Sequence, residues 1–118
     1  MTRRAPRRDA NKPVADIDCV LRTLADPTRM RLFRSLRASE RCVRDLVETE
    51  DLSQPLVSHH LRVLQEAGLV QSRRRAGFVL YAIDPDGLDA AYSAISELFD
   101  LNHLAAVAAP GGNTECCR

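Results

Sequence analysis

The sequence predicts a mostly helical domain with one small β-hairpin, in the order α-α-α-α-β-β-α. Two observations indicate this fold class. Apolar residues recur at helical spacing in five segments, four of which begin with a serine or aspartate suited to capping a helix. A single stretch near the middle of the chain alternates between residue types, as paired strands do. The length of 118 residues is that of one domain.

The first two helices are predicted from apolar stripes and from a start signal between them. The first covers residues 14–25, and its stripe consists of Val14, Ile17, Leu21 and Leu24. Asp26 and Pro27 begin the second helix, over residues 27–36, because aspartate caps free amide groups and proline is tolerated at the first helical position. We expect Met30, Phe33 and Leu36 to point inward, and Arg29, Arg31 and Arg34 to point outward.

Two serines are expected to cap the next two helices. Ser39 precedes a third helix over residues 40–48, whose buried residues are Val43, Leu46 and Val47. Ser53 precedes a fourth helix that tolerates Pro55 in its first turn and ends at Gly68. Two short helices joined by a tight turn, the second well capped, are typical of a helix-turn-helix.

The rest of the chain predicts a hairpin, a last helix and two tails. Residues 69–75 and 78–83 form the hairpin around the Ala76-Gly77 turn, with three arginines at its tip. Asp84 and Pro85 begin the last amphipathic helix, which extends towards Ala105. Three regions are therefore expected: a disordered basic arm over residues 1–12, a winged helix-turn-helix over residues 13–108, and a flexible cysteine-containing tail over residues 109–118.

The net charge of +1 hides an uneven distribution. Residues 53–82 carry four basic residues against one acid, whereas residues 83–118 carry one against six. A basic middle suits a polyanionic partner. No stretch approaches the roughly 20 uncharged apolar residues of a membrane span, and no apolar signal-peptide core follows the basic N-terminus. We therefore expect a cytoplasmic protein that does not cross a membrane.

The predicted fourth helix has a polar face opposite its apolar one. Gln54, Ser58 and Arg62 follow one another at helical spacing, with His59 beside them. Glutamine can read adenine, and arginine can contact guanine or phosphate, so this face suits a major groove. The alternative is a solvated helix face and a solvated arginine turn. The expected DNA-binding residues are Ser53, Gln54, Pro55, Ser58, His59, Arg62, Arg73, Arg74 and Arg75. His60 lies on the apolar side, which favours a structural role.

Three segments together resemble the ArsR/SmtB family of bacterial winged-helix repressors, which release DNA on binding metal or metalloid ions. They are ADPTRMRLFRSL at residues 25–36, SQPLVSHHLRVLQEAGLV at residues 53–70 and RRRAGFVLYAI at residues 73–83. The resemblance covers about residues 17–104. It implies a homodimer formed through the first and last helices, double-stranded operator DNA as partner, and Gln54, Ser58 and His59 on the DNA-reading helix.

The family's ligand motifs are only partly present. The third-helix arsenic and cadmium motif, E-L-C-V-C-D-L, corresponds to residues 40–46, where Cys42 is kept and Arg44 replaces the second cysteine. The last-helix zinc motif needs Asp-x-His, but Leu88 stands in the histidine position and only His103 follows. The resemblance therefore implies no zinc or cobalt site on the last helix.

The remaining ligand candidates are four thiols. Cys42, close to a helix start and to Arg41 and Arg44, is the expected anchor for a soft ion. The adjacent Cys116 and Cys117 could supply two more sulfurs from the tail, and three thiolates suit As(III) or Sb(III). Cys19 is the second choice as a partner, since it is equally suited to being a small buried hydrophobe.

The sequence therefore predicts a repressor that leaves its operator when trivalent arsenic or antimony binds cysteine thiolates, without an organic cofactor. The alternative is the same fold sensing cadmium, another thiophilic ion, an oxidant or sulfane sulfur through Cys42 and Cys19. An enzyme, such as a thiol reductase using Cys116 and Cys117, is not expected. The sequence has no phosphate-binding loop, no catalytic acid–base pair and no C-x-x-C motif.

Overall fold

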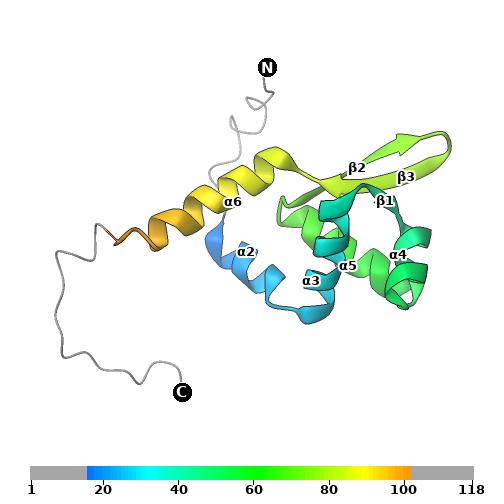
Figure 1. Ribbon diagram of the computed structural model, residues 1–118, viewed down its shortest axis with the longest axis horizontal. Coiled ribbons are helices and arrows are strands. Elements are labelled where there is room, and N and C mark those ends of the chain that lie inside the picture. Colours follow the sequence, from blue (N-terminus) through cyan, green and yellow to red (C-terminus); the bar gives the residue numbers. More distant parts are fainter. Residues whose placement is uncertain (1–15, 102–118) are drawn as a thin grey trace.

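The structure, a computed structural model, describes residues 16–101 and confirms a mostly helical winged helix-turn-helix (Figure 1). The expected arm and tail lie outside the described residues. In chain order the elements are α2 (Ile17–Leu24), α3 (Pro27–Ala38), β1 (Arg41–Cys42), α4 (Val43–Glu50), α5 (Gln54–Glu66), β2 (Val70–Arg75), β3 (Phe78–Ile83) and α6 (Pro85–Leu98). Among these helices none is long and apolar enough to cross a membrane.

Three of the predicted helix starts are confirmed by their capping hydrogen bonds. The Asp26 carboxylate accepts from the backbone amides of Thr28 and Arg29, at 2.9 and 3.1 Å. The Ser53 hydroxyl accepts from the amide of Leu56, and the Asp84 carboxylate accepts from the first turn of α6. These caps fix where α3, α5 and α6 begin because they satisfy amides that have no partner within the helix.

The predicted start of the third helix is wrong. Ser39 ends α3 instead of capping a new helix, and α4 begins only at Val43, with Cys42 in its N-cap position. Arg41 and Cys42 form the short strand β1, which pairs antiparallel with Tyr81 and Leu80 of β3. Backbone pairing with a distant strand overrides the local helical pattern here, and it turns the predicted hairpin into a three-stranded sheet.

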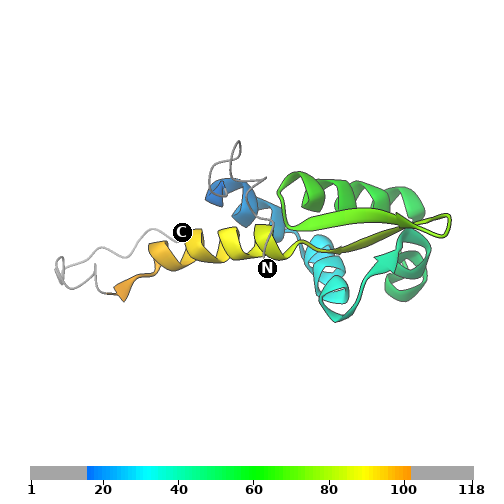
Figure 2. The ribbon, with the colours of Figure 1, turned by 90° about the horizontal axis from the view of Figure 1, so that it is seen from above.

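The sheet has the order β1-β3-β2, and its hairpin has the predicted strands and turn. The pairs run from Val70 opposite Ile83 to Arg75 opposite Phe78, on either side of Ala76 and Gly77. Successive side chains of β2 point to opposite faces. Figures 1 and 2 show that the hairpin and α6 extend from opposite ends of the helical body.

The core lies where α3, α4 and α5 meet. Its side chains with no exposed surface are Leu32, Leu46, Val57, Leu61, Leu64 and Leu69. Phe33 and Leu36 are buried as predicted, and Met30 is half-buried against this core. Because α5 contributes three of these side chains, it packs against both α3 and α4 and is held at the centre of the domain.

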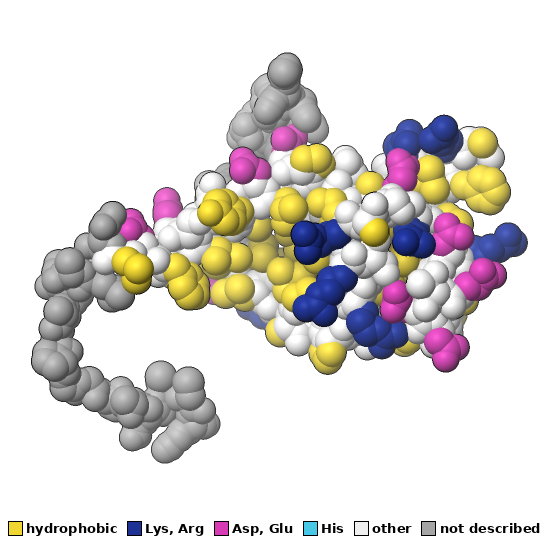
Figure 3. All heavy atoms as spheres, in the orientation of Figure 1, with side chains coloured by type: hydrophobic (Ala, Val, Ile, Leu, Met, Phe, Trp, Pro, Cys, Tyr) yellow, Lys and Arg dark blue, Asp and Glu magenta, His cyan; other side chains and the backbone are white. Residues whose placement is uncertain are grey.

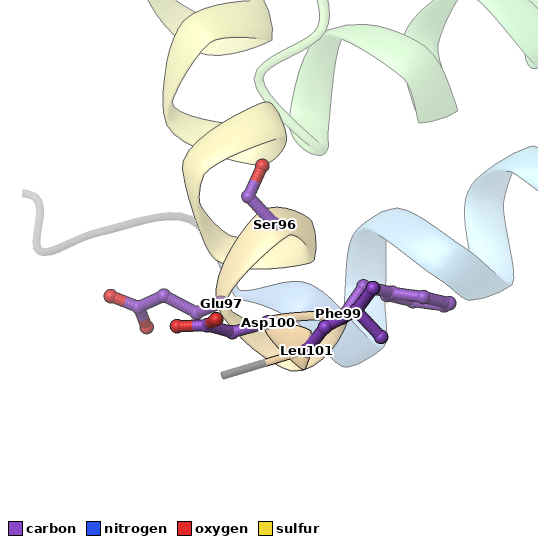
Figure 4. A pocket seen from close by; sticks show the side chains of 5 residues that line it. All are labelled: Ser96, Glu97, Phe99, Asp100 and Leu101. Carbon is purple, nitrogen blue, oxygen red and sulfur yellow. The ribbon is translucent and has the colours of Figure 1, made fainter. Parts of the chain in front are cut away.

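Most of α6 lies outside the core. Ala91 is its one buried residue, and large apolar side chains are exposed along the helix and just beyond it; Figure 3 shows them in yellow on the face in view. A shallow hollow at the end of α6 is lined by Ser96, Glu97, Phe99, Asp100 and Leu101. Figure 4 shows Glu97 and Asp100 pointing to one side of the chain and Phe99 to the other.

The first turn of α6 rests directly on the chain that leaves α5. The Asp84 amide donates to the Leu69 carbonyl at 3.0 Å. Gly87 lies so close to the Gly68 backbone that a Cβ atom at position 87 would overlap the Gly68 carbonyl oxygen. Glycine at position 87 is therefore required by the close approach of these two segments.

Gly87→Ala is expected to destabilise the fold by about 1–3 kcal/mol, because the added methyl group must push α6 away from Gly68. The free energy of unfolding, measured by urea denaturation, tests this. Ser93→Ala is the matched control, since Ser93 is exposed on the same helix. Equal stability of the Gly87 variant and wild type would contradict the described contact.

Candidate nucleic-acid interface

Helix α5 has one buried face and one exposed polar face. Val57, Leu61 and Leu64 have no exposed surface, so they fix the rotation of the helix about its axis. The residues predicted to meet DNA from this segment are all exposed: Ser53, Gln54, Pro55, Ser58, His59 and Arg62. Their accessibility agrees with the prediction, and their contact with DNA stays a prediction.

His60 and Arg29 form a half-buried link between α5 and α3. His60 is 6% exposed, which agrees with its predicted structural role. Arg29 Nη1 lies 3.1 Å from His60 Nδ1, and Arg29 Nε donates to the Thr23 carbonyl at 2.9 Å. Arginine has only donors, so Nδ1 must accept and the imidazole is neutral. The predicted outward direction of Arg29 is therefore wrong: its guanidinium satisfies a carbonyl and a ring nitrogen inside the domain.

The three arginines of β2 do not form one charged tip. They lie along the strand, and Ala76 and Gly77 make the turn. Arg74 shares a face of the sheet with Ser72, whose hydroxyl accepts from Gln65 of α5 at 3.2 Å. Arg73 and Arg75 lie on the opposite face. Only Arg74 is thus on the side of the hairpin that α5 approaches.

Two ion pairs occupy arginines near this surface. Arg73 donates to both carboxylate oxygens of Glu40, at 2.6 and 2.8 Å, and this hydrogen bonding lowers the pKa of Glu40. Arg31 donates to the carboxylate and the backbone carbonyl of Glu50, tying α3 to the end of α4. A hydrogen bond from Ser35, followed by that from Arg31, lowers the pKa of Glu50. Figure 3 shows basic side chains both at the far end of the hairpin and over the helical body.

Comparison of the amino-acid sequence with known proteins shows the family of this chain. A family model described as "Bacterial regulatory protein, arsR family" matches residues 26–72, from the cap of α3 into β2. The arsenical resistance operon repressor of Staphylococcus xylosus is 32% identical over 74 residues, covering 63% of this chain and 71% of that repressor. The chain belongs to the ArsR family.

Other ArsR-family relatives agree with this assignment. The HTH-type transcriptional repressor SmtB of Mycobacterium tuberculosis is 45% identical over 64 residues, covering 54% of this chain and 47% of that protein. A crystal structure described as a possible transcriptional regulator for arsenical resistance is 37% identical, with a TM-score of 0.60, over 75% of this chain and 95% of that one. The chain spans about half the length of SmtB and of the arsenic resistance transcriptional regulator ArsR1 of Pseudomonas putida, which it matches at 41% identity over 57% of this chain.

The described thiols lie on different elements. Cys19 is half-buried on α2, which packs against α3 and α6. Cys42 is half-buried on β1, which packs against β3 and α4. Within residues 16–101 no three histidine, cysteine or acidic side chains gather to hold a metal ion. The predicted role of Cys42 and Cys19 as ligands stays a prediction, and the other ligand candidates, Cys116 and Cys117, lie outside the described residues, as does His103.

Two residues next to the arginines of β2, Glu40 and Phe78, are not among the residues predicted from the sequence. Glu40 meets Arg73 although the two are 33 positions apart, and no local pattern joins them. Phe78 is 56% exposed and lies opposite Arg75, next to the hairpin turn. The alternation of residues in the strand does carry a signal for Phe78, because it predicts an aromatic side chain on the same face as Arg75.

The link between His60 and Arg29 predicts a pH-dependent stability. Burial, partly offset by Asp26, lowers the pKa of His60 below its ordinary value of 6.5. As the pH falls, the unfolded chain therefore binds a proton before the folded protein does, and the free energy of unfolding decreases. This contribution is complete above about pH 6.5 and is lost as the pH falls towards the lower pKa of the folded state.

His60→Gln should flatten the pH dependence, because the amide oxygen can accept from Arg29 but does not titrate. Urea denaturation between about pH 7.5 and 5 measures this. His59→Gln is the control, since His59 is an exposed neighbour on the same helix. If both variants keep the wild-type slope, the buried imidazole is not its source.

Proposed function

We propose that this protein is a cytoplasmic DNA-binding transcriptional repressor whose α5 enters the major groove. The observation that carries the proposal is the division of α5 into a buried apolar face and an exposed polar face. The buried face of a recognition helix anchors it to the rest of the domain, while the side chains of its exposed face remain free to contact base edges. The hairpin beside α5 carries three arginines, which suits contacts with the phosphate backbone.

Different side chains have different roles in this proposal. Gln54, Ser58 and Arg62, with His59 beside them, read base edges, because their amide, hydroxyl, guanidinium and imidazole groups can match base donors and acceptors. Ser53 and Pro55 bring the N-terminal end of α5 close to the DNA backbone, where free helix amides favour anions. Arg74 and Arg75 bind phosphate, and Arg73 does so once it leaves Glu40.

We further propose that the protein acts as a homodimer through α2 and α6. The exposed apolar side chains of these two helices and the residues following α6 support this arrangement: Leu21, Leu88, Tyr92, Leu98, Phe99 and Leu101. Tyr92 is 69% exposed and Phe99 is 72% exposed, so a second copy could bury a large apolar area. Two recognition helices would then meet half-sites about 34–36 Å apart.

The inducer in this proposal is trivalent arsenic or antimony. Relatives described as arsenical resistance regulators support this choice, as does the retained Cys42. Cys42 would be one ligand, with Cys116 and Cys117 as the others and Cys19 as a less favoured partner. Soft thiolates bind such ions strongly, and the bound ion would draw the tail towards β1.

Arg74→Ala is expected to weaken DNA binding about equally on all sequences and to reduce the salt-dependence slope by about 1. Gln54→Ala is expected instead to cost about 1–3 kcal/mol at particular base pairs. Fluorescence anisotropy with labelled duplexes from the region upstream of the coding sequence measures both effects, together with unrelated duplexes of equal length.

Arg34→Ala provides the matched control for these variants. Arg34 is an exposed arginine on α3, outside the proposed dimer helices and the proposed DNA-binding residues. Its replacement should leave the affinity and the salt slope close to wild type. Equal losses for Arg34→Ala and Arg74→Ala would indicate a general effect of net charge and would contradict the proposed orientation.

Cys42→Ser, and separately a truncation before Cys116, should each abolish release by arsenite while leaving DNA affinity unchanged. The measurement is anisotropy of the reduced protein on its duplex during titration with arsenite, then with antimonite. Cys19→Ser should retain most of the response. Full response by the truncated protein would exclude the tail thiols. Release by peroxide or persulfide, with arsenite inert, would support sensing of oxidants or sulfane sulfur instead.

A further inference from the structure

The ion pair between Glu40 and Arg73 joins the segment between α3 and β1 to the hairpin strand β2. Glu40 follows the end of α3 and directly precedes β1, whereas Arg73 lies in the middle of β2. One guanidinium nitrogen, Nη2, approaches both carboxylate oxygens, at 2.6 and 2.8 Å. The Arg73 side chain is 54% exposed, so solvent and a polyanion can both reach it.

The second acid–arginine pair of this surface is built differently. Glu50 accepts from Ser35 as well as from Arg31, and Arg31 also holds the Glu50 backbone carbonyl, so that pair braces α3 against α4. The side-chain hydrogen bonds of Glu40 within residues 16–101 both come from Arg73. An exposed pair of this kind adds little to stability, because solvent screens the attraction between its charges. Its larger effect is on what else Arg73 can bind.

A carboxylate and a phosphate compete for the same guanidinium donors, because both are anions with oxygens spaced for charge-assisted hydrogen bonds. While Glu40 occupies Arg73, the positive charge of β2 is reduced from three arginines to the equivalent of two. Arg74 lies on the other face of the sheet. Arg75 shares the face of Arg73 and attracts Glu40 through its charge, but both side-chain hydrogen bonds of Glu40 among the described residues come from Arg73.

We propose that Glu40 is an internal competitor for DNA phosphate, which holds Arg73 in the free protein and must be displaced before Arg73 can bind the DNA backbone. The inference rests on the proposed function, and it identifies Glu40 as a residue that limits the affinity of the protein for DNA. In this proposal Arg73 binds phosphate and not a base. Its occupation by Glu40 therefore lowers binding to all sequences alike and leaves base discrimination unchanged. It is therefore a positioning residue for Arg73 and not itself a DNA contact.

The test is a double-mutant cycle of Glu40→Gln and Arg73→Ala, measured by anisotropy on the labelled upstream duplex between about 50 and 200 mM salt. Glu40→Gln should raise affinity about two- to fivefold, the factor corresponding to one exposed ion pair. It should also steepen the salt slope by up to about 0.9, because Arg73 then neutralises one more phosphate. With Arg73 already replaced by alanine, Glu40→Gln should raise affinity no more than removal of an unpaired surface charge does, because only the weaker charge interaction with Arg75 remains.

Glu48→Gln removes the same charge from an exposed position on α4 and is the matched control. A gain equal to that of Glu48→Gln, or a gain of undiminished size in the Arg73→Ala background, would overturn the proposal by assigning the effect to net charge. Normal binding by wild type with no gain in Glu40→Gln would overturn it too, while leaving the DNA-binding function intact. If neither wild type nor Glu40→Gln binds any duplex, the proposed function itself fails.

Discussion

The burial of one face of α5 is the constraint on which the rest of the structure depends. Val57, Leu61 and Leu64 are closed off from solvent by α3 and α4, so the helix can neither rotate nor tilt without opening the core. The link from His60 through Arg29 to the Thr23 carbonyl adds a polar restraint on the same side. The exposed residues from Gln54 to Arg62 consequently keep one orientation relative to the hairpin.

Much of this fold is predictable because its helices carry their own boundaries. Asp26, Ser53 and Asp84 each cap the helix that follows, and the alternation after Gly68 indicates the hairpin. The segment from Glu40 to Cys42 was predicted as helix because its sequence pattern is helical. Its strand conformation depends on β3, a partner far along the chain, and single-sequence periodicity contains no information about that pairing.

The parts of the site that depend on local sequence are predictable, whereas the parts that depend on contacts between distant segments are not. The exposed face of α5 follows from helical spacing within one segment, so its residues were identified from the sequence. The directions of Arg29 and Arg73 depend on groups that only the folded chain brings near them. Arg29 finds a ring nitrogen on α5, and Arg73 finds the Glu40 carboxylate. Counting positive charges along the sequence therefore overstates how many arginines are available to a partner.

The pairing of β1 also fixes the distance between a ligand candidate and the hairpin. Cys42 lies opposite Leu80, and Leu80 lies opposite Arg73, so the three residues form one row across the sheet. Two strand spacings separate the ends of this row, a backbone distance of about 10 Å. Cys42 is therefore only two strands away from Arg73 within one sheet, and the path between them passes through β3 and not through α5 or α6.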